Sequence, residues 1–194
     1  MPTAPSARVA VVIPSYRVTR HVLDVIARIP VRVERIFVVD DCCPDGSGDL
    51  VQRNCVDPRV TVLRNAVNLG VGGAVLHGYT EAVAAGMDII VKIDGDGQMD
   101  PGLIAAFIAP IEAGEADYTK GNRFFEIETV QQMPLLRLVG NIGLSFLTKA
   151  SSGYWHLFDP TNGYTAIHAR VAAWLPQTKI HSRYFFESDM LLRL

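Results

Sequence analysis

The 194-residue sequence has few cysteines, no long apolar run and no excess of basic charge. Its three cysteines, Cys42, Cys43 and Cys55, lack the spacing of a zinc site, and an odd number favours a reducing compartment over a disulfide framework. No stretch approaches the ~20 apolar residues of a membrane-spanning helix, and residues 1–7 hold no apolar core of a signal peptide. The net charge of −2, with scattered Lys and Arg, argues against a nucleic-acid partner.

Two common signatures of hydrolytic enzymes are also missing. The five histidines show no pairing typical of metal ligands, and no Gly-X-Ser-X-Gly nucleophile turn occurs. Zinc chemistry and serine hydrolase chemistry are therefore not supported. About half of the residues are hydrophobic, which is enough for the core of one domain over residues 1–194. Residues 187–194 form a helix pattern without a stop signal, so we expect a C-terminally truncated chain and leave open a membrane anchor after Leu194.

Strand and helix patterns alternate along the chain. Nearly continuous apolar runs predict strands at residues 9–13, 35–39, 60–63 and 88–93, and shorter strands are predicted at 118–124 and 165–167. Helical spacing and turn signals predict helices at residues 21–29, 49–54, 68–85, 135–149, 168–175 and from 186. This order predicts an α/β fold with a Rossmann-like, mostly parallel sheet flanked by helices, in which residues 9–13 form the central strand.

An acidic turn, Asp94-Gly95-Asp96-Gly97-Gln98, follows the strand at residues 88–93, and Asp100-Pro101 then supplies an N-cap and a first-turn proline. The turn lies at the carboxyl edge of the sheet, where ligands bind in open α/β folds. Asp94, Asp96 and the Gln98 carbonyl offer hard oxygens to Mg²⁺ or Mn²⁺, whose remaining ligands come from phosphates and water. The alternative is a solvated acidic turn without a ligand.

Two other features belong to the same edge. Asp40 and Asp41 end the second strand, and they either cap the next turn or present one carboxylate to a ligand. The glycine-rich loop at residues 68–73 has the wrong spacing for a dinucleotide fingerprint and lacks its acidic residue. We therefore predict close backbone packing for these glycines rather than phosphate binding.

The segment at residues 135–149 predicts an amphipathic helix. Its polar stripe is formed by Arg137, Asn141, Ser145 and Lys149, and apolar residues fill the rest of its surface. Such a face is buried either in the protein core, which is the default, or in a membrane interface. Tyr154 and Trp155 nearby suit an interface.

Seven short motifs occur in an order that resembles a known family. They are Val-Val-Ile-Pro-Ser-Tyr (11–16), Val-Val-Asp-Asp (38–41), Asn-Leu-Gly-Val-Gly-Gly-Ala (68–74), Asp-Gly-Asp-Gly-Gln (94–98), Gly-Asn-Arg-Phe (121–124), Asp-Pro-Thr-Asn-Gly-Tyr (159–164) and Phe-Glu-Ser-Asp-Met-Leu (186–191). The chain resembles the inverting family 2 glycosyltransferases of GT-A fold, and among them the dolichyl- or polyprenyl-phosphate hexose (mannose) synthases. The resemblance covers almost the whole chain.

The resemblance implies roles for individual residues. Nucleotide-sugar binding is implied for Pro14, Tyr16, Asp41, Asp94, Gly95 and Asp96. Metal binding is implied for Asp94, Asp96 and Gln98. Acceptor-phosphate binding is implied for Arg123, Arg137 and Asn141, the last standing where the family has serine. Arg17-Val18 replaces the family's usual Asn-Glu, so the choice between UDP and GDP stays open, and the family's later basic segment is absent.

The implied reaction is the inverting, divalent-metal-dependent transfer of a hexose from a nucleotide-diphosphate sugar to a lipid phosphate. Residues 1–120 would bind the donor and residues 121–194 the acceptor, with Asp96, Arg123 and Asp189 as the catalytic residues. We then expect a cytoplasmic enzyme, peripheral at or anchored to the cytosolic membrane face. Two alternatives remain. The acceptor is a saccharide hydroxyl, with Asp189 as the base, or the chain is a non-catalytic sugar-nucleotide-binding module.

Overall fold

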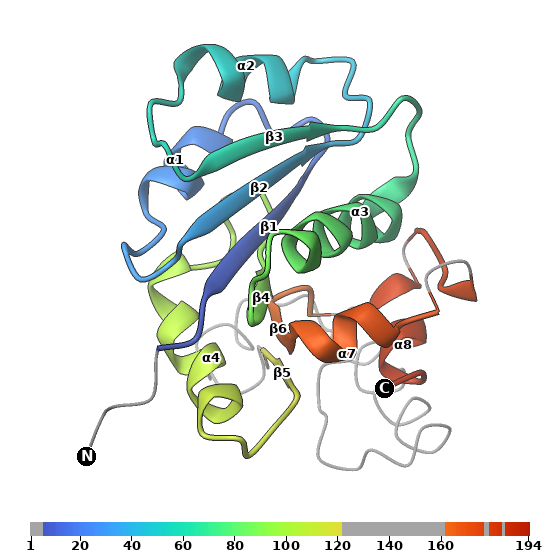
Figure 1. Ribbon diagram of the computed structural model, residues 1–194. Helices are drawn as coiled ribbons and strands as arrows, with labels where there is room; N and C mark the ends of the chain where they lie inside the picture. Colours follow the sequence, from blue (N-terminus) through green and yellow to red (C-terminus); the bar gives the residue numbers. More distant parts are fainter. Residues whose placement is uncertain (1–5, 122–161, 177–178, 184) are drawn as a thin grey trace, which may run out of the picture.

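A six-stranded sheet forms the centre of the molecule in the computed structural model, which describes residues 6–121, 162–176, 179–183 and 185–194 (Figure 1). The strands are β1 (Val9–Ser15), β2 (Arg35–Asp40), β3 (Val60–Arg64), β4 (Ile89–Lys92), β5 (Tyr118–Lys120) and β6 (Thr165–His168). Their order is β3-β2-β1-β4-β6-β5, and among these described strands β6 alone points against the other five. The predicted mostly parallel sheet with a central first strand is confirmed. The predicted helix at residues 135–149 lies outside the described residues.

Helices cover both faces of the sheet. One face carries α1 (Val22–Ala27), α2 (Ser47–Asn54) and α4 (Ile104–Glu112), and the other carries α3 (Gly70–Ala84), α7 (Ala169–Trp174) and α8 (Phe186–Leu191) (Figure 1). Strand β1 packs against both layers, because Val9, Val11 and Ile13 point to the first face and Ala10 and Val12 to the second. Within the described residues, no helix combines the length and the apolarity needed to cross a bilayer.

Two aspartates fix where helices begin. The Asp100 carboxylate accepts a hydrogen bond from the Gly102 amide at 3.1 Å and caps the 3₁₀ turn η1 (Pro101–Leu103) before α4, which confirms the predicted cap. Asp40 accepts hydrogen bonds from the amides of Cys43 at 2.8 Å and Gly48 at 2.9 Å. Helix α2 therefore begins two residues before the predicted start, because its cap comes from the end of β2.

The glycine-rich loop packs directly against a distant segment. The amides of Gly72 and Gly73 both donate to the Ser182 carbonyl, at 2.8 and 3.2 Å, and a Cβ at Gly72 would lie 2.7 Å from the His181 carbonyl oxygen. The prediction of close backbone packing is confirmed. These two amides are already used, and the contact brings Arg183 beside the start of α3.

Candidate nucleotide-sugar site

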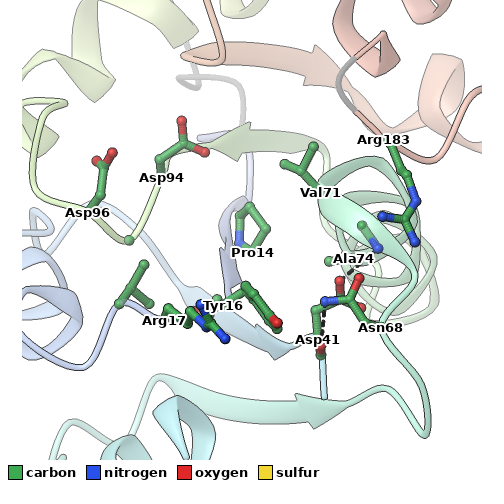
Figure 2. Close-up of a pocket in the computed structure, with 14 residues that line it drawn as sticks. Pro14, Tyr16, Arg17, Asp41, Asn68, Val71, Ala74, Asp94, Asp96 and Arg183 are labelled. Atoms are coloured by element: carbon green, nitrogen blue, oxygen red, sulfur yellow. Dashed lines mark hydrogen bonds between the residues drawn. The ribbon is translucent and has the colours of Figure 1, made fainter. Parts of the chain in front are cut away.

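A pocket of about 840 Å³ opens at the carboxyl edge of the sheet, between β1 and β4 (Figure 2). These two strands are neighbours in the sheet, but the chain runs from β1 to β2 on one side of β1, while β4 lies on its other side. The loops that follow β1 and β4 therefore diverge and leave a crevice between them. The lining residues are Pro14, Ser15, Tyr16, Arg17, Val18, Asp41, Asn68, Gly70, Val71, Ala74, Asp94, Gly95, Asp96 and Arg183. All six residues predicted to bind the nucleotide-sugar are among them, and their role stays a prediction.

The acidic turn presents two carboxylates to this pocket. Asp94 is 32% exposed, and Asp96 accepts a hydrogen bond from the Gln98 amide at 3.0 Å, which closes the turn. Gly97 has a φ of 82°, a conformation that favours glycine. Gln98 itself is exposed and does not line the pocket, so its predicted metal-ligand role gains no support from the pocket lining.

The donor set restricts which metal the turn fits. Among the described residues, no group of three or more His, Cys, Asp and Glu side chains converges to form a metal site of protein ligands alone. Two hard carboxylates beside a pocket instead fit an ion such as Mg²⁺ or Mn²⁺, which is commonly held by one or two carboxylates plus phosphate oxygens and water.

Asp41 is both a cap and a lining residue. Its buried carboxylate accepts hydrogen bonds from the Asn65 side chain at 2.7 Å and from the amides of Leu69 and Gly70 at 2.8 Å each. Three donors thus hold it at the pocket wall, and the implied bond to a nucleotide base would use its remaining acceptor capacity. Its neighbour Asp40 caps α2 and does not line the pocket.

Arg17 replaces the residue expected after Tyr16 and shapes this side of the pocket. Its φ is 59°, and its guanidinium carbon lies 5.4 Å from the centre of the Tyr16 ring. The Arg17 amide also donates to the Cys43 sulfur at 3.1 Å. Burial raises the pKa of the Cys43 thiol, but hydrogen bonds from the Ser47 side chain and from the amides of Arg17, Ser47 and Asp45 outweigh it, so the pKa is lowered overall.

Arg183 is a lining residue that the sequence analysis missed. Figure 2 shows it with Asn68 and Ala74, across the pocket from Asp94 and Asp96. It comes from the segment that packs on the glycine-rich loop, more than 80 residues after Asp96 in the chain. In the sequence, the only hint that Arg183 belongs to the site was its position shortly before the Phe-Glu-Ser-Asp motif. Tertiary packing is what brings Arg183 to the donor side of the pocket.

Asp189, predicted as a catalytic residue, does not line this pocket. One of its carboxylate oxygens accepts a hydrogen bond from the His181 amide at 2.7 Å and the other pairs with Arg193 at 2.9 Å, in a separate hollow. The nearby carboxylate of α8 is Glu187, which shares the ammonium of Lys92 with Asp94. The predicted catalytic role of Asp189 gains no support from the lining of this pocket and stays a prediction, because the helix turns its two acids to different surroundings.

The acceptor side of the predicted site lies elsewhere in the chain. Arg123, Arg137 and Asn141 fall within residues 122–161, outside the described residues. Their predicted contacts to an acceptor phosphate stay predictions.

Comparison with known proteins decides the family. The model of glycosyl transferase family 2 matches residues 10–173. The chain belongs to this family. It is 30% identical to polyprenol monophosphomannose synthase of Mycolicibacterium smegmatis, covering 97% of this chain and 72% of that protein. It is also 29% identical to a UDP-N-acetylglucosamine--dolichyl-phosphate N-acetylglucosaminyltransferase of Methanococcus voltae, covering 93% and 77%.

The family assignment agrees with the fold. The chain is similar to glucosyl-3-phosphoglycerate synthase of Mycobacterium tuberculosis in complex with Mn²⁺, UDP and phosphoglyceric acid, with a TM-score of 0.72 and 20% identity. The match covers 95% of this chain and 63% of that structure. The predicted GT-A fold and membership of the family 2 glycosyltransferases are confirmed.

Proposed function

We propose that this glycosyltransferase moves a hexose from a nucleotide-diphosphate sugar to a polyprenyl or dolichyl phosphate, with inversion and with a divalent cation. The observation that carries the donor half is the convergence of Tyr16, Asp41, Asp94 and Asp96 on one pocket at the strand switch point. The acceptor class rests on the names of the relatives, which act on polyprenyl or dolichyl phosphate.

In the donor site, Pro14 and Tyr16 are proposed to contact the base, Asp41 to hydrogen-bond it, and Asp94 with Gly95 to hold the ribose and diphosphate. Arg183 lines the pocket on the side opposite the two aspartates and is proposed to pair with the diphosphate. Asp96, with Asp94, would hold Mg²⁺ or Mn²⁺, which when bound neutralises the charge that develops on the leaving nucleoside diphosphate. Mn²⁺ and UDP occur together in the structurally similar synthase.

The transfer itself is proposed as a single displacement. An acceptor phosphate oxygen forms a bond to the anomeric carbon while the bond from that carbon to the diphosphate breaks, so the configuration inverts. A phosphate monoester is already ionised near neutral pH, and no strong base is required. We propose that the acceptor phosphate is held by Arg123, Arg137 and Asn141. Residues 121–194 would then supply the acceptor site and, through Arg183, one contact to the donor. A lipid acceptor would hold the enzyme at the cytosolic membrane surface.

A saccharide hydroxyl is the second candidate acceptor. Such an acceptor would need a carboxylate to take its proton. The position of Glu187 beside the Lys92–Asp94 pair favours Glu187 over Asp189 for that role. Parallel assays with polyprenyl phosphate and with a saccharide acceptor separate the two candidates.

Isothermal titration with UDP- and GDP-sugars, each with and without Mn²⁺, tests the donor site. We expect binding of one nucleotide class that requires the metal. Release of nucleoside diphosphate on addition of polyprenyl phosphate then tests the reaction. Binding of neither nucleotide would refute the proposal, whereas binding without turnover on any acceptor would favour a non-catalytic module.

A further inference from the structure

Lys92 is a charged residue in the protein interior. It ends β4, two positions before Asp94, and its side chain is 2% exposed. In the sheet it lies opposite Thr165 of β6, which is also buried. Burying an ammonium group so far from solvent costs free energy unless carboxylates pair with it. The residues that pair with Lys92 therefore explain how its charge can be buried here.

Two carboxylates from different segments share this ammonium. The Lys92 Nζ lies 2.7 Å from Asp94 Oδ1 and 3.5 Å from Glu187 Oε1, and Glu187 is 12% exposed. The backbone of Gly163 closes the arrangement, because a Cβ there would overlap Lys92 Nζ and lie 3.0 Å from Asp94 Oδ2. The Lys92 ammonium is therefore the point where three segments meet: the acidic turn, the turn before β6 and helix α8.

This arrangement limits how Asp94 can move. One carboxylate oxygen is held by Lys92, while the side chain still lines the pocket. Without the ammonium, Asp94 and Glu187 would be two nearby acids with no cation between them, and they would repel. A site residue fixed in this way meets its ligand without first losing side-chain freedom.

We propose that Lys92 is a positioning residue of the donor site: it fixes the Asp94 carboxylate for a nucleoside diphosphate and ties helix α8 to that carboxylate through Glu187. The affinity part of this inference rests on the proposed function, since it takes the pocket to be the nucleotide-sugar site. The ion network itself does not depend on that assignment.

The test compares Lys92→Met, Glu187→Gln and the double variant with the wild type. Lys92→Met keeps the aliphatic length and removes the charge, and we expect it to weaken binding of UDP or GDP with Mn²⁺ at least tenfold by isothermal titration. Glu187→Gln leaves Asp94 to hold Lys92 and should weaken binding less than threefold. In urea, Glu187→Gln should lower the unfolding midpoint of the wild type but raise that of Lys92→Met, where it removes a repulsion.

Thr165→Val is the matched control, because it changes a buried neighbour of Lys92 without changing any charge. It should leave nucleotide affinity within twofold even if the midpoint falls. Should Lys92→Met yield no folded protein, Gly163→Ala serves instead, since its methyl displaces the ammonium while keeping the charge.

Unchanged affinity in Lys92→Met or Gly163→Ala would overturn the proposal, and so would additive midpoints in the double variant. If the wild type binds neither UDP nor GDP, the proposed function fails. The midpoints then still decide whether Lys92 couples Asp94 to Glu187.

Discussion

Asp41 holds the first residue of helix α3 in place, because its Oδ2 accepts a hydrogen bond from the Gly70 amide at 2.8 Å. Replacing Asp41 with alanine removes the charged acceptor of three part-buried hydrogen bonds, and we expect the free energy of unfolding to fall by about 1–3 kcal/mol. Urea denaturation measures this. The exposed Asp45→Ala in the same loop is the control and should change stability by less than about 0.5 kcal/mol. Equal stability of both variants would contradict the capping role of Asp41.

Asp96→Asn tests the proposed metal site. The amide oxygen of asparagine can still accept the hydrogen bond from the Gln98 amide, so we expect stability to change by less than about 0.5 kcal/mol. Metal-dependent affinity for the nucleoside diphosphate should fall at least about tenfold, since a carboxylate ligand is lost. Titration with and without Mn²⁺ measures this, and the exposed Asp24→Asn is the control. A variant that keeps wild-type, metal-dependent affinity would remove Asp96 from the site.

Cys43 should react as a thiolate at lower pH than an ordinary cysteine. Its pKa is lowered, so at a given pH below that pKa a larger fraction is ionised, and the thiolate is the nucleophile. In a Cys42→Ser, Cys55→Ser background, the rate of alkylation by iodoacetamide should reach its half-maximal value at a lower pH than that of a cysteine in an unstructured peptide measured alongside. Because the Cys43 sulfur accepts from the Arg17 amide at the pocket wall, we expect bound nucleotide to slow this reaction. A half-maximal value at the same pH as the peptide thiol, or at a higher pH, would contradict the hydrogen-bond account.

Asp189→Ala should affect stability rather than donor binding. Its carboxylate, 15% exposed, accepts from the His181 amide and pairs with Arg193, so its loss should cost about 1–2 kcal/mol of unfolding free energy. The affinity for the nucleoside diphosphate should stay within about twofold of wild type, a difference below about 0.5 kcal/mol. Titration and urea denaturation give both values. Loss of turnover with unchanged affinity would instead support the catalytic role that the sequence predicted for Asp189.

The sequence by itself determined the strands, their alternation with helices and the edge at which the site lies. Runs such as residues 9–13 and 89–91 are apolar and mostly β-branched, as expected of buried parallel strands with apolar side chains on both faces, and this pattern is local. The carboxylates of Asp94 and Asp96 follow directly from such a run, so their place at the carboxyl edge could be predicted without any tertiary contact.

Tertiary structure alone decided which distant residues complete the site. Helix α2 begins where Asp40 caps it, Arg183 reaches the pocket because His181 and Ser182 pack on Gly72, and Glu187 rather than Asp189 meets Lys92. Each depends on a hydrogen bond, a close backbone approach or an ion pair between residues in different elements, and no periodicity in the sequence encodes such pairs. Helical spacing placed Glu187 and Asp189 on one short helix, but the packing of α8 against α3 and the sheet decided which acid meets Lys92.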